Sequence, residues 1–252
     1  MGSNLLLIEV SRVINLHKMT FNGIDRRNSS ILELSAMMLA VQHYQKENYT
    51  TSPVNPVSKG NPNGQFFDPK WGTNGYPRAH SYWKITRSGK EFEIHLNAPV
   101  WDGQGGKSGV FVVDVGIIKS KAPLKADPKD KRIFGFRNNN LVTFIEAKSF
   151  NIYPMLVAHF IGIVNEIKPW AMKGKSPKGF IRGSHFDPSL VSRGYPKGNT
   201  GRLLNSIPKR KLRIRVIHDF DKYVEKGNLA SSSAPSVLKR NKKSIWMAQE
   251  WK

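Results

Sequence analysis

The chain has 252 residues, and its 40 Lys and Arg residues against 18 Asp and Glu residues give a formal net charge of +22. This length is sufficient for one medium-sized α/β domain with a sizeable core. The absence of cysteine excludes disulfides, thiolate nucleophiles and cysteine-based zinc sites. No apolar run approaches the roughly 20 residues of a membrane helix, and no basic leader of a signal peptide is present. We therefore predict a cytoplasmic protein without membrane contact.

The positive charge is concentrated in the last third of the chain. Residues 168–215 contain 13 Lys and Arg residues and a single acidic residue, Asp187. A surface of this charge attracts polyanions and accelerates their encounter. Nucleic acid is therefore the leading partner, while solubility alone and a membrane-surface habit remain as alternatives.

The first half of the chain predicts a helix followed by a long loop. Residues 4–16 fit either a short strand or a helix. Ser30 and Glu33 form a capping box, and apolar residues then recur at helical spacing, which predicts a helix at 30–47. Proline, glycine and asparagine are frequent in residues 50–80, which is typical of a loop.

Strands dominate the middle of the chain. Two strands, 82–86 and 91–96, flank a Ser-Gly turn and predict a hairpin. The nearly continuous apolar run at 110–118 is typical of a central strand. A lysine-rich, solvated segment at 119–132 then leads to a further strand at 141–148.

The last third begins with an apolar helix. The expected elements are a helix at 152–167, a basic loop at 171–187, a strand at 189–193, a helix at 199–206 and a strand at 211–218. From about residue 224 the chain is rich in serine, alanine and lysine. We predict a core domain at 1–223 and a basic C-terminal tail at 224–252.

Three charged residues stand inside apolar strands. Asp114 lies in the 110–118 strand, and Glu146 and Lys148 lie in the 141–148 strand. Burying such groups is costly unless they are paired or bind a metal. Side chains at i and i+2 share a strand face, so Glu146 and Lys148 point the same way, about 7 Å apart. If the two strands are neighbours, Asp114 joins them.

The two carboxylates then offer oxygen ligands of the kind that Mg²⁺ prefers. The backbone carbonyl of Ala147 is a third protein oxygen on the same strand. A bound cation stabilises charge on a phosphate and activates water. Lys148 is placed to orient that water or to stabilise the transition state.

The order of these elements resembles the PD-(D/E)xK nuclease superfamily, whose fold is called restriction-endonuclease-like. The resemblance implies an α/β fold with a central mixed β-sheet flanked by helices. It also implies a Mg²⁺ or Mn²⁺ ion held by Asp114, Glu146 and the carbonyl of Ala147, with Lys148 assisting the water. Many members add a glutamate from the first core helix, for which Glu33 is the candidate, although its capping role is slightly favoured.

Two features depart from the usual pattern of that superfamily. Val113 stands where proline precedes the aspartate. The separation of 32 positions between Asp114 and Glu146 is long, and we assign the excess to the basic loop at 119–138.

Basic and aromatic residues suggest a nucleic-acid surface. The candidates for phosphate contact are Arg182, Arg193, Lys197, Arg202, Lys209, Arg210 and Lys211. Arg213 and Arg215 share a strand face and are expected to project as one basic stripe. The aromatic candidates, which either stack on bases or pack their own loop, are Trp71, Tyr76 and Tyr82. Asn151 and Tyr153 flank the site, either contacting a phosphate or simply exposed.

The hypothesis is a magnesium-dependent endodeoxyribonuclease that acts on DNA in restriction, phage or mobile-element processing. Other motifs do not compete, because Gly105–Ser108 lacks the full phosphate-loop pattern and no HExxH zinc motif is present. The alternatives are a non-catalytic, basic nucleic-acid-binding protein and an assembly protein. Since double-strand cleavage needs two active centres, a homodimer is a further alternative.

Overall fold

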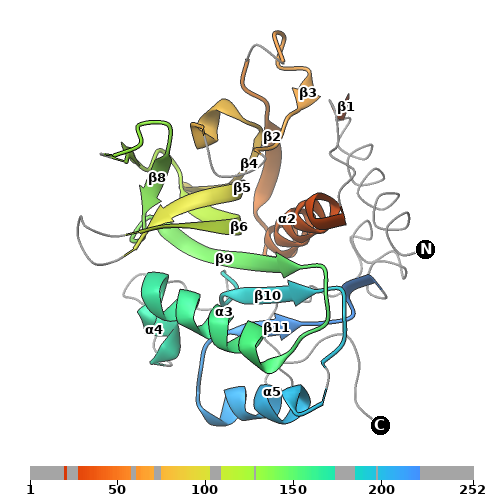
Figure 1. The fold of residues 1–252 in the computed structure, drawn as a ribbon. Helices are drawn as coiled ribbons and strands as arrows, with labels where there is room; N and C mark the ends of the chain where they lie inside the picture. Colours follow the sequence, from red (N-terminus) through yellow and green to blue (C-terminus); the bar gives the residue numbers. More distant parts are fainter. Residues whose placement is uncertain are drawn as a thin grey trace.

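The computed structural model describes residues 20–21, 28–57, 61–70, 75–102, 109–127, 129–173, 185–196 and 198–221. They form an α/β fold around a mixed sheet of nine strands with helices on both sides (Figure 1). The predicted class, a central mixed sheet flanked by helices, is confirmed. In these ranges no helix is both long and apolar enough to cross a bilayer.

The elements before residue 102 are β1 (Thr20–Phe21), α2 (Asn28–Lys46), β2 (Thr50–Val54), β3 (Phe66–Phe67), the 3-10 turn η1 (Pro77–Ala79), β4 (Tyr82–Arg87) and β5 (Lys90–Trp101). The middle of the chain forms β6 (Val110–Lys119), β7 (Leu124–Ala126), β8 (Phe134–Arg137) and β9 (Leu141–Lys148). The remainder forms α3 (Pro154–Ile167), α4 (Pro169–Met172), β10 (Ser189–Ser192), α5 (Thr200–Lys209) and β11 (Arg215–Ile217).

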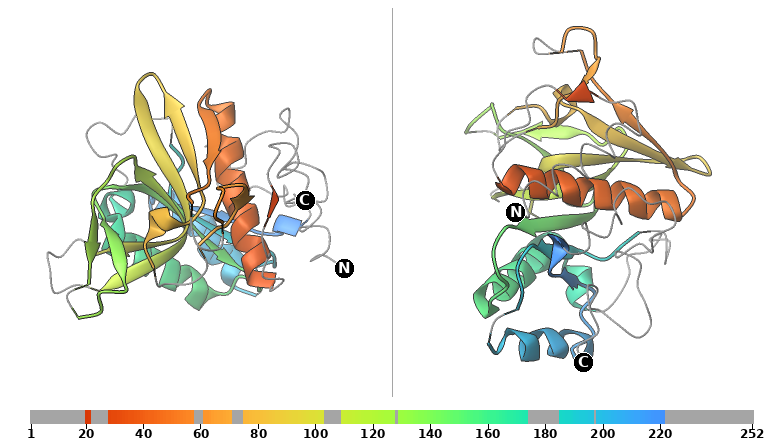
Figure 2. Two further views of the ribbon diagram at one scale, coloured as in Figure 1. Left: turned by 90° about the horizontal axis from the view of Figure 1, so that it is seen from above. Right: turned by 90° about the vertical axis from the view of Figure 1, so that its right-hand side faces the viewer.

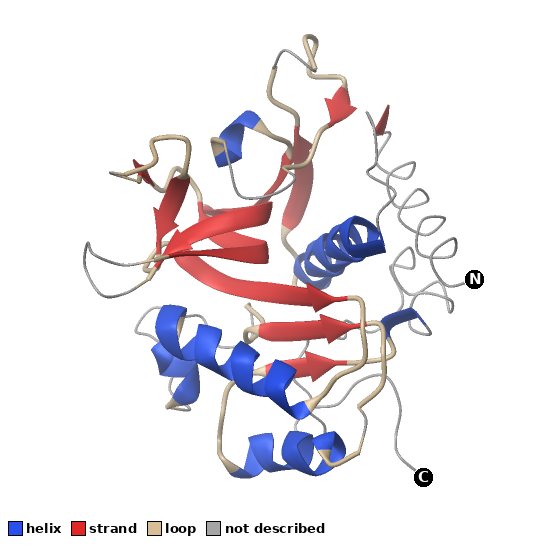
Figure 3. Cartoon of the chain, in the orientation of Figure 1, coloured by secondary structure: helices blue, strands red, loops and turns tan. Residues whose placement is uncertain are grey.

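The sheet has an antiparallel part and a parallel part. Its main path runs β11-β10-β9-β6-β5-β4-β2. Along this path, neighbours from β2 to β9 are antiparallel, whereas β10 and β11 run parallel to β9 (Figure 3). Off the path, β8 pairs with β5 in parallel. Parallel neighbours need a crossover, which α3 and α4 provide between β9 and β10. The carboxyl ends of β9, β10 and β11 therefore meet at one edge.

Local sequence explains the hairpin of β4 and β5. Ser88 and Gly89 both have positive φ, at 50° and 75°. Two such residues in succession match the right-handed twist of paired strands. The predicted hairpin is confirmed, and β5 continues beyond the predicted end to Trp101.

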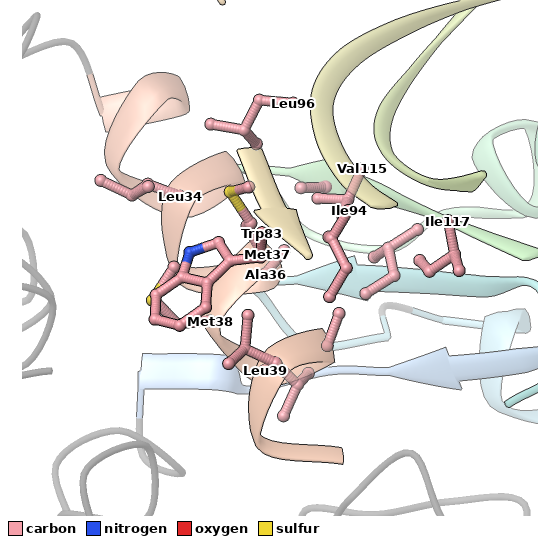
Figure 4. Close-up of a cluster of buried hydrophobic side chains, with 14 of the residues drawn as sticks. Leu34, Ala36, Met37, Met38, Leu39, Trp83, Ile94, Leu96, Val115 and Ile117 are labelled. Carbon is pink, nitrogen blue, oxygen red and sulfur yellow. The ribbon is translucent and has the colours of Figure 1, made fainter. Parts of the chain in front are cut away.

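Apolar side chains bury both faces of the sheet. Helix α2 packs against one face, where Leu34, Met37 and Met38 lie among residues such as Trp83 and Ile94 (Figure 4). Each fully buried side chain of this kind stabilises the fold by about 1.5–3 kcal/mol. A second cluster, which includes residues of α3 and α5, covers the opposite face (Figure 2).

The predicted capping box of α2 is wrong. The helix begins at Asn28, so Ser30 lies inside it rather than at its N-cap. Glu33 is accordingly in the second turn, beyond the first-turn backbone N–H groups that a capping carboxylate satisfies.

Three other sequence predictions change. Residues 50–80 contain β2, whose residues Thr50 to Val54 pair with β4. Pro53 is tolerated there because β2 is an edge strand. The solvated segment at 119–132 contains β7, which pairs with β8. The 211–218 strand is reduced to Arg215–Ile217, since only these residues have a partner on β10. Residues 4–16 and the tail at 224–252 lie outside the described residues.

Candidate active site

The pairing of β6 with β9 places Asp114 opposite Glu146. Val115 pairs with Ile145, and in the antiparallel register the next positions along the two strands are Asp114 and Glu146. Lys148 follows Glu146 by two residues and shares its strand face. The structure thus brings together three side chains that are separated in sequence.

The three side chains contact one another directly. Lys148 Nζ donates to Asp114 Oδ2 at 2.9 Å and lies 3.0 Å from Glu146 Oε2. The backbone N–H of Ala147 donates to the same Asp114 Oδ2 at 2.7 Å. One ammonium group therefore lies between two carboxylates near the carboxyl end of β9.

Burial and like charge alter the ionisation of this cluster. The Glu146 side chain is 6% exposed, against 13% for Asp114 and 26% for Lys148. Burial, followed by the charge of Asp114, raises the pKa of Glu146 to about 7. Burial by itself lowers the pKa of Lys148, but the charges of Glu146 and Asp114 outweigh it and raise that pKa above its ordinary value.

One carboxylate oxygen of the cluster has no partner. Glu146 Oε1 is buried and, among the described residues, accepts no hydrogen bond. Leaving a buried acceptor unsatisfied costs about 1–3 kcal/mol, and more for a charged group. A cation beside Oε1 would remove that cost.

The backbone supplies a third oxygen on the correct side. Arg193 N–H donates to the Lys148 carbonyl at 3.2 Å, so that carbonyl points towards β10. Carbonyls of successive strand residues point to opposite edges, so the Ala147 carbonyl points towards β6, where Asp114 lies.

These donors fit a hard cation such as Mg²⁺. Within the described ranges, no group of three or more His, Cys, Asp or Glu side chains is placed to hold a metal ion. The donor set is instead two carboxylates and one backbone carbonyl. Mg²⁺ is usually bound by one or two carboxylates and keeps several waters, so the oxygen-only set suits it.

Glu33 comes near the same part of the sheet through Asn97. Asn97 Nδ2 donates to Glu33 Oε2 at 3.0 Å. Because Leu96 pairs with Val115 and Ala98 with Val113, Asn97 lies opposite Asp114. The role of Glu33 as a metal ligand stays a prediction.

Sequence reasoning did not identify Asn97 and Lys70 as neighbours of the site. Lys70 Nζ donates to the Asn97 carbonyl at 3.1 Å, and Asn97 Nδ2 donates back to the Lys70 carbonyl at 3.2 Å. Burial lowers the pKa of Lys70 to about 8. Lys70 lies in the segment predicted as a loop, where no periodicity indicated a buried lysine.

The residues predicted to contact phosphate lie in different environments. Arg202, Lys209, Arg210 and Lys211 are exposed on α5 and just after it. Arg193 is 14% exposed and forms an ion pair with Asp221 at 2.7 Å. Arg182 and Lys197 lie outside the described residues.

The predicted basic stripe of Arg213 and Arg215 is wrong. Both residues are buried. Arg213 pairs with Asp187 at 2.7 Å, and its guanidinium carbon lies 5.4 Å from the centre of the Trp170 ring. Alternation predicted that the arginines share an exposed face, but β11 begins only at Arg215 and the fold buries both side chains.

The aromatic candidates also differ from one another. Tyr82 stacks on His95 at 4.7 Å, and Tyr76 packs edge-on against Phe134 at 5.5 Å. Both contacts agree with the packing interpretation. Trp71 lies outside the described residues.

The chain was also compared with known proteins. No family model, curated protein or solved structure matches it. Its function is therefore inferred from the residues and geometry of the site itself.

Proposed function

We propose that this protein is a metal-dependent nuclease of the PD-(D/E)xK type that hydrolyses phosphodiester bonds in DNA. The observation that carries the proposal is the meeting of Asp114, Glu146 and Lys148, with Glu146 Oε1 buried and unpartnered. An incomplete buried carboxylate at a sheet edge is a feature of functional sites more than of stable cores.

The arrangement of elements around the site supports the same proposal. Helix α2 is followed by the antiparallel strands β5, β6 and β9, then by α3 and the parallel strand β10. This order resembles that of a restriction-endonuclease-like core and supports the proposal. The motif residues stand at corresponding places, with Asp114 on β6 and both Glu146 and Lys148 on β9.

Each residue has a defined role in the proposed hydrolysis. Asp114, Glu146 and the Ala147 carbonyl would hold Mg²⁺ or Mn²⁺, which when bound supplies Lewis-acid stabilisation of charge on the phosphate. Glu146 must first release its proton. Lys148 orients the attacking water and stabilises negative charge on the phosphoryl oxygens. In the net reaction a water oxygen bonds to phosphorus, one phosphorus–oxygen ester bond breaks, and the departing oxygen gains a proton.

Cleavage assays test this proposal directly. The full-length parent is expected to cut DNA with Mg²⁺ or Mn²⁺ and not with EDTA. Asp114→Asn and Glu146→Gln should each lower the rate by more than roughly 100-fold, because even outer partners of a metal site contribute up to that factor. Glu91→Gln, which changes a partly exposed carboxylate on β5, is the matched control. A parent that cuts no DNA with either metal would refute the nuclease.

The net charge of +22 and the exposed residues near α5 would bind the phosphate backbone. Replacing Lys209, Arg210 and Lys211 by alanine should weaken DNA binding and flatten its salt dependence. The slope of log K against log salt should fall by about 0.9 for each lost duplex phosphate contact. The control replaces the exposed Lys125, Lys129 and Lys131 by alanine, which removes the same charge from another part of the chain. An equal loss of DNA affinity from this control would argue against a DNA-binding surface near α5.

A second candidate function is a non-catalytic nucleic-acid-binding protein. The observation that favours it is the contact of Lys148 with both carboxylates, which neutralises part of their charge without a metal. In that case the parent would bind DNA, cut none of it, and bind equally well after Glu146→Gln.

A further inference from the structure

Three large aromatic side chains are exposed just beyond the candidate active site. Phe150 is 46% exposed, Tyr153 45% and Tyr195 40%. Aromatic rings bury a large apolar area and dominate cores and interfaces. An exposed group of them marks an interaction surface more often than a scattered single residue does.

The fold brings these rings to the carboxyl edge of the parallel strands. Phe150 follows Lys148 by two residues, and its ring lies 6.0 Å from that of Tyr153. The Ile152 N–H donates to the Tyr195 carbonyl at 3.1 Å. Because β9 and β10 are parallel, the segments that follow them leave the sheet at one edge (Figure 1).

Backbone contacts hold the two segments in register. The Tyr195 N–H donates to Asn151 Oδ1 at 3.0 Å, and Ser192 Oγ donates to the Phe150 carbonyl. A Cβ atom at Gly194 would lie 2.5 Å from the Cα atom of Asn151, so only glycine permits this approach. The rings are therefore carried on a preorganised pair of segments, which lowers the entropic cost of binding.

The charge of the flanking sequence favours a polyanion. No acidic residue occurs in 149–165 or in 188–218. Among the described residues of the second range, the exposed cations are Arg202, Lys209, Arg210 and Lys211. A single nucleic-acid strand offers both chemistries that this surface fits, with bases for the rings and phosphates for the cations. Paired bases are already stacked within a duplex and present no free ring face.

We propose that Phe150, Tyr153 and Tyr195 form a stacking platform for unpaired bases of the DNA strand whose phosphate is held at Asp114, Glu146 and Lys148. The inference rests on the proposed nuclease function and names its substrate class. That substrate is single-stranded or locally unpaired DNA. The platform holds the bases beside the scissile phosphate.

Binding without cleavage tests the platform. In the full-length Glu146→Gln protein with EDTA, fluorescence anisotropy measures the Kd of a labelled single-stranded oligonucleotide and of a fully paired, blunt-ended duplex. Phe150→Ala, Tyr153→Ala and Tyr195→Ala should each weaken single-strand binding roughly 5- to 100-fold, with little change for the duplex. Tyr153→Phe and Tyr195→Phe should retain the parent affinity, since each keeps its ring.

The matched control is Tyr76→Ala, because Tyr76 is similarly exposed at 43% but packs against Phe134 in a different part of the molecule. It should leave both affinities unchanged, and thermal unfolding should show that every variant is folded. A single-strand affinity that none of the three alanine variants lowers would overturn the platform. So would an equal loss for strand and duplex, which indicates a contribution to DNA binding that does not depend on unpaired bases. Failure of the nuclease proposal would instead appear as a parent that does not cut.

Discussion

Two buried glutamates on the same sheet illustrate different uses of a buried charge. Glu93 on β5 and Glu146 on β9 are 3% and 5% exposed. Glu93 accepts from Arg78 Nε at 2.9 Å and from the Lys121 N–H at 3.1 Å, and it lies 2.9 Å from His95 Nε2. Both its oxygens are therefore satisfied. Glu146 has Lys148 beside one oxygen, and no partner within the described residues for the other.

The pKa values of the two carboxyls move in opposite directions. Burial alone raises the pKa of Glu93, but the hydrogen bond and charge of His95, with Arg78, bring it down to about 2. Burial and the charge of Asp114 raise that of Glu146 to about 7. Complete partnering makes Glu93 a structural group, whereas the unpartnered oxygen of Glu146 supports the cation site that we propose there. Perturbed, under-satisfied groups of this kind mark functional sites.

The largest stability effect is expected at Glu93. Glu93→Gln leaves the half-buried Arg78 guanidinium without its counter-ion. This should lower the free energy of unfolding at pH 7 by about 3–5 kcal/mol. The contribution of Glu93 is present above the ordinary carboxyl pKa of 4.5 and is lost as pH falls towards 2. Urea unfolding at pH 7 and pH 3.5 measures both quantities, and an equally large loss at both pH values would contradict the ionic role.

Replacing Glu146 by Gln should change the free energy of unfolding by less than Glu93→Gln does, and in the opposite direction. Its raised pKa means that the folded state holds the proton more tightly, so its stabilisation below pH 4.5 is lost as pH rises through about 7. In EDTA, Glu146→Gln should therefore be more stable than the parent at pH 8, by about 1–3 kcal/mol. The difference should vanish at pH 4, below the ordinary carboxyl pKa of 4.5. A Glu146→Gln protein that is less stable at pH 8 would show that Glu146 is a satisfied structural group.

The smallest effect is expected at Glu91, also on β5. Glu91 pairs with Lys84 at 2.8 Å, but the two side chains are 35% and 39% exposed. Exposed ion pairs contribute little because water screens them. Glu91→Gln should leave the melting temperature unchanged at pH 7. A clearly lower melting temperature would mean that pairing with a cation stabilises the fold even where the pair is not buried.

Much of the fold was predictable because local patterns agree with it. The helix at 30–47, the hairpin, the strands at 110–118 and 141–148, and the helix at 152–167 all correspond to elements of the structure. The expectation that Asp114 joins Glu146 and Lys148 depended on one further condition, that the two strands are neighbours. The structure meets that condition through the β6–β9 pairing.

Other features depend on distant residues and were not predictable. The Ser30–Glu33 pattern fits a capping box, yet the helix starts two residues earlier at Asn28. Arg213 and Arg215 alternate as exposed residues do, but Asp187 and Trp170 cover Arg213 from other segments. A periodic pattern shows which residues share a face and carries no information on what packs against that face.

The sequence by itself determined most helices and strands along the chain, the basic charge and the candidate residues Asp114, Glu146 and Lys148, because periodicity and charge are local properties. Only the tertiary structure decided which of the buried carboxylates are fully partnered. It also brought Phe150, Tyr153 and Tyr195 to one edge, since parallel pairing of β9 and β10 joins segments more than 40 positions apart. Hydrogen-bond satisfaction and solvent exposure depend on such distant neighbours, so neither property could be assigned from local sequence patterns.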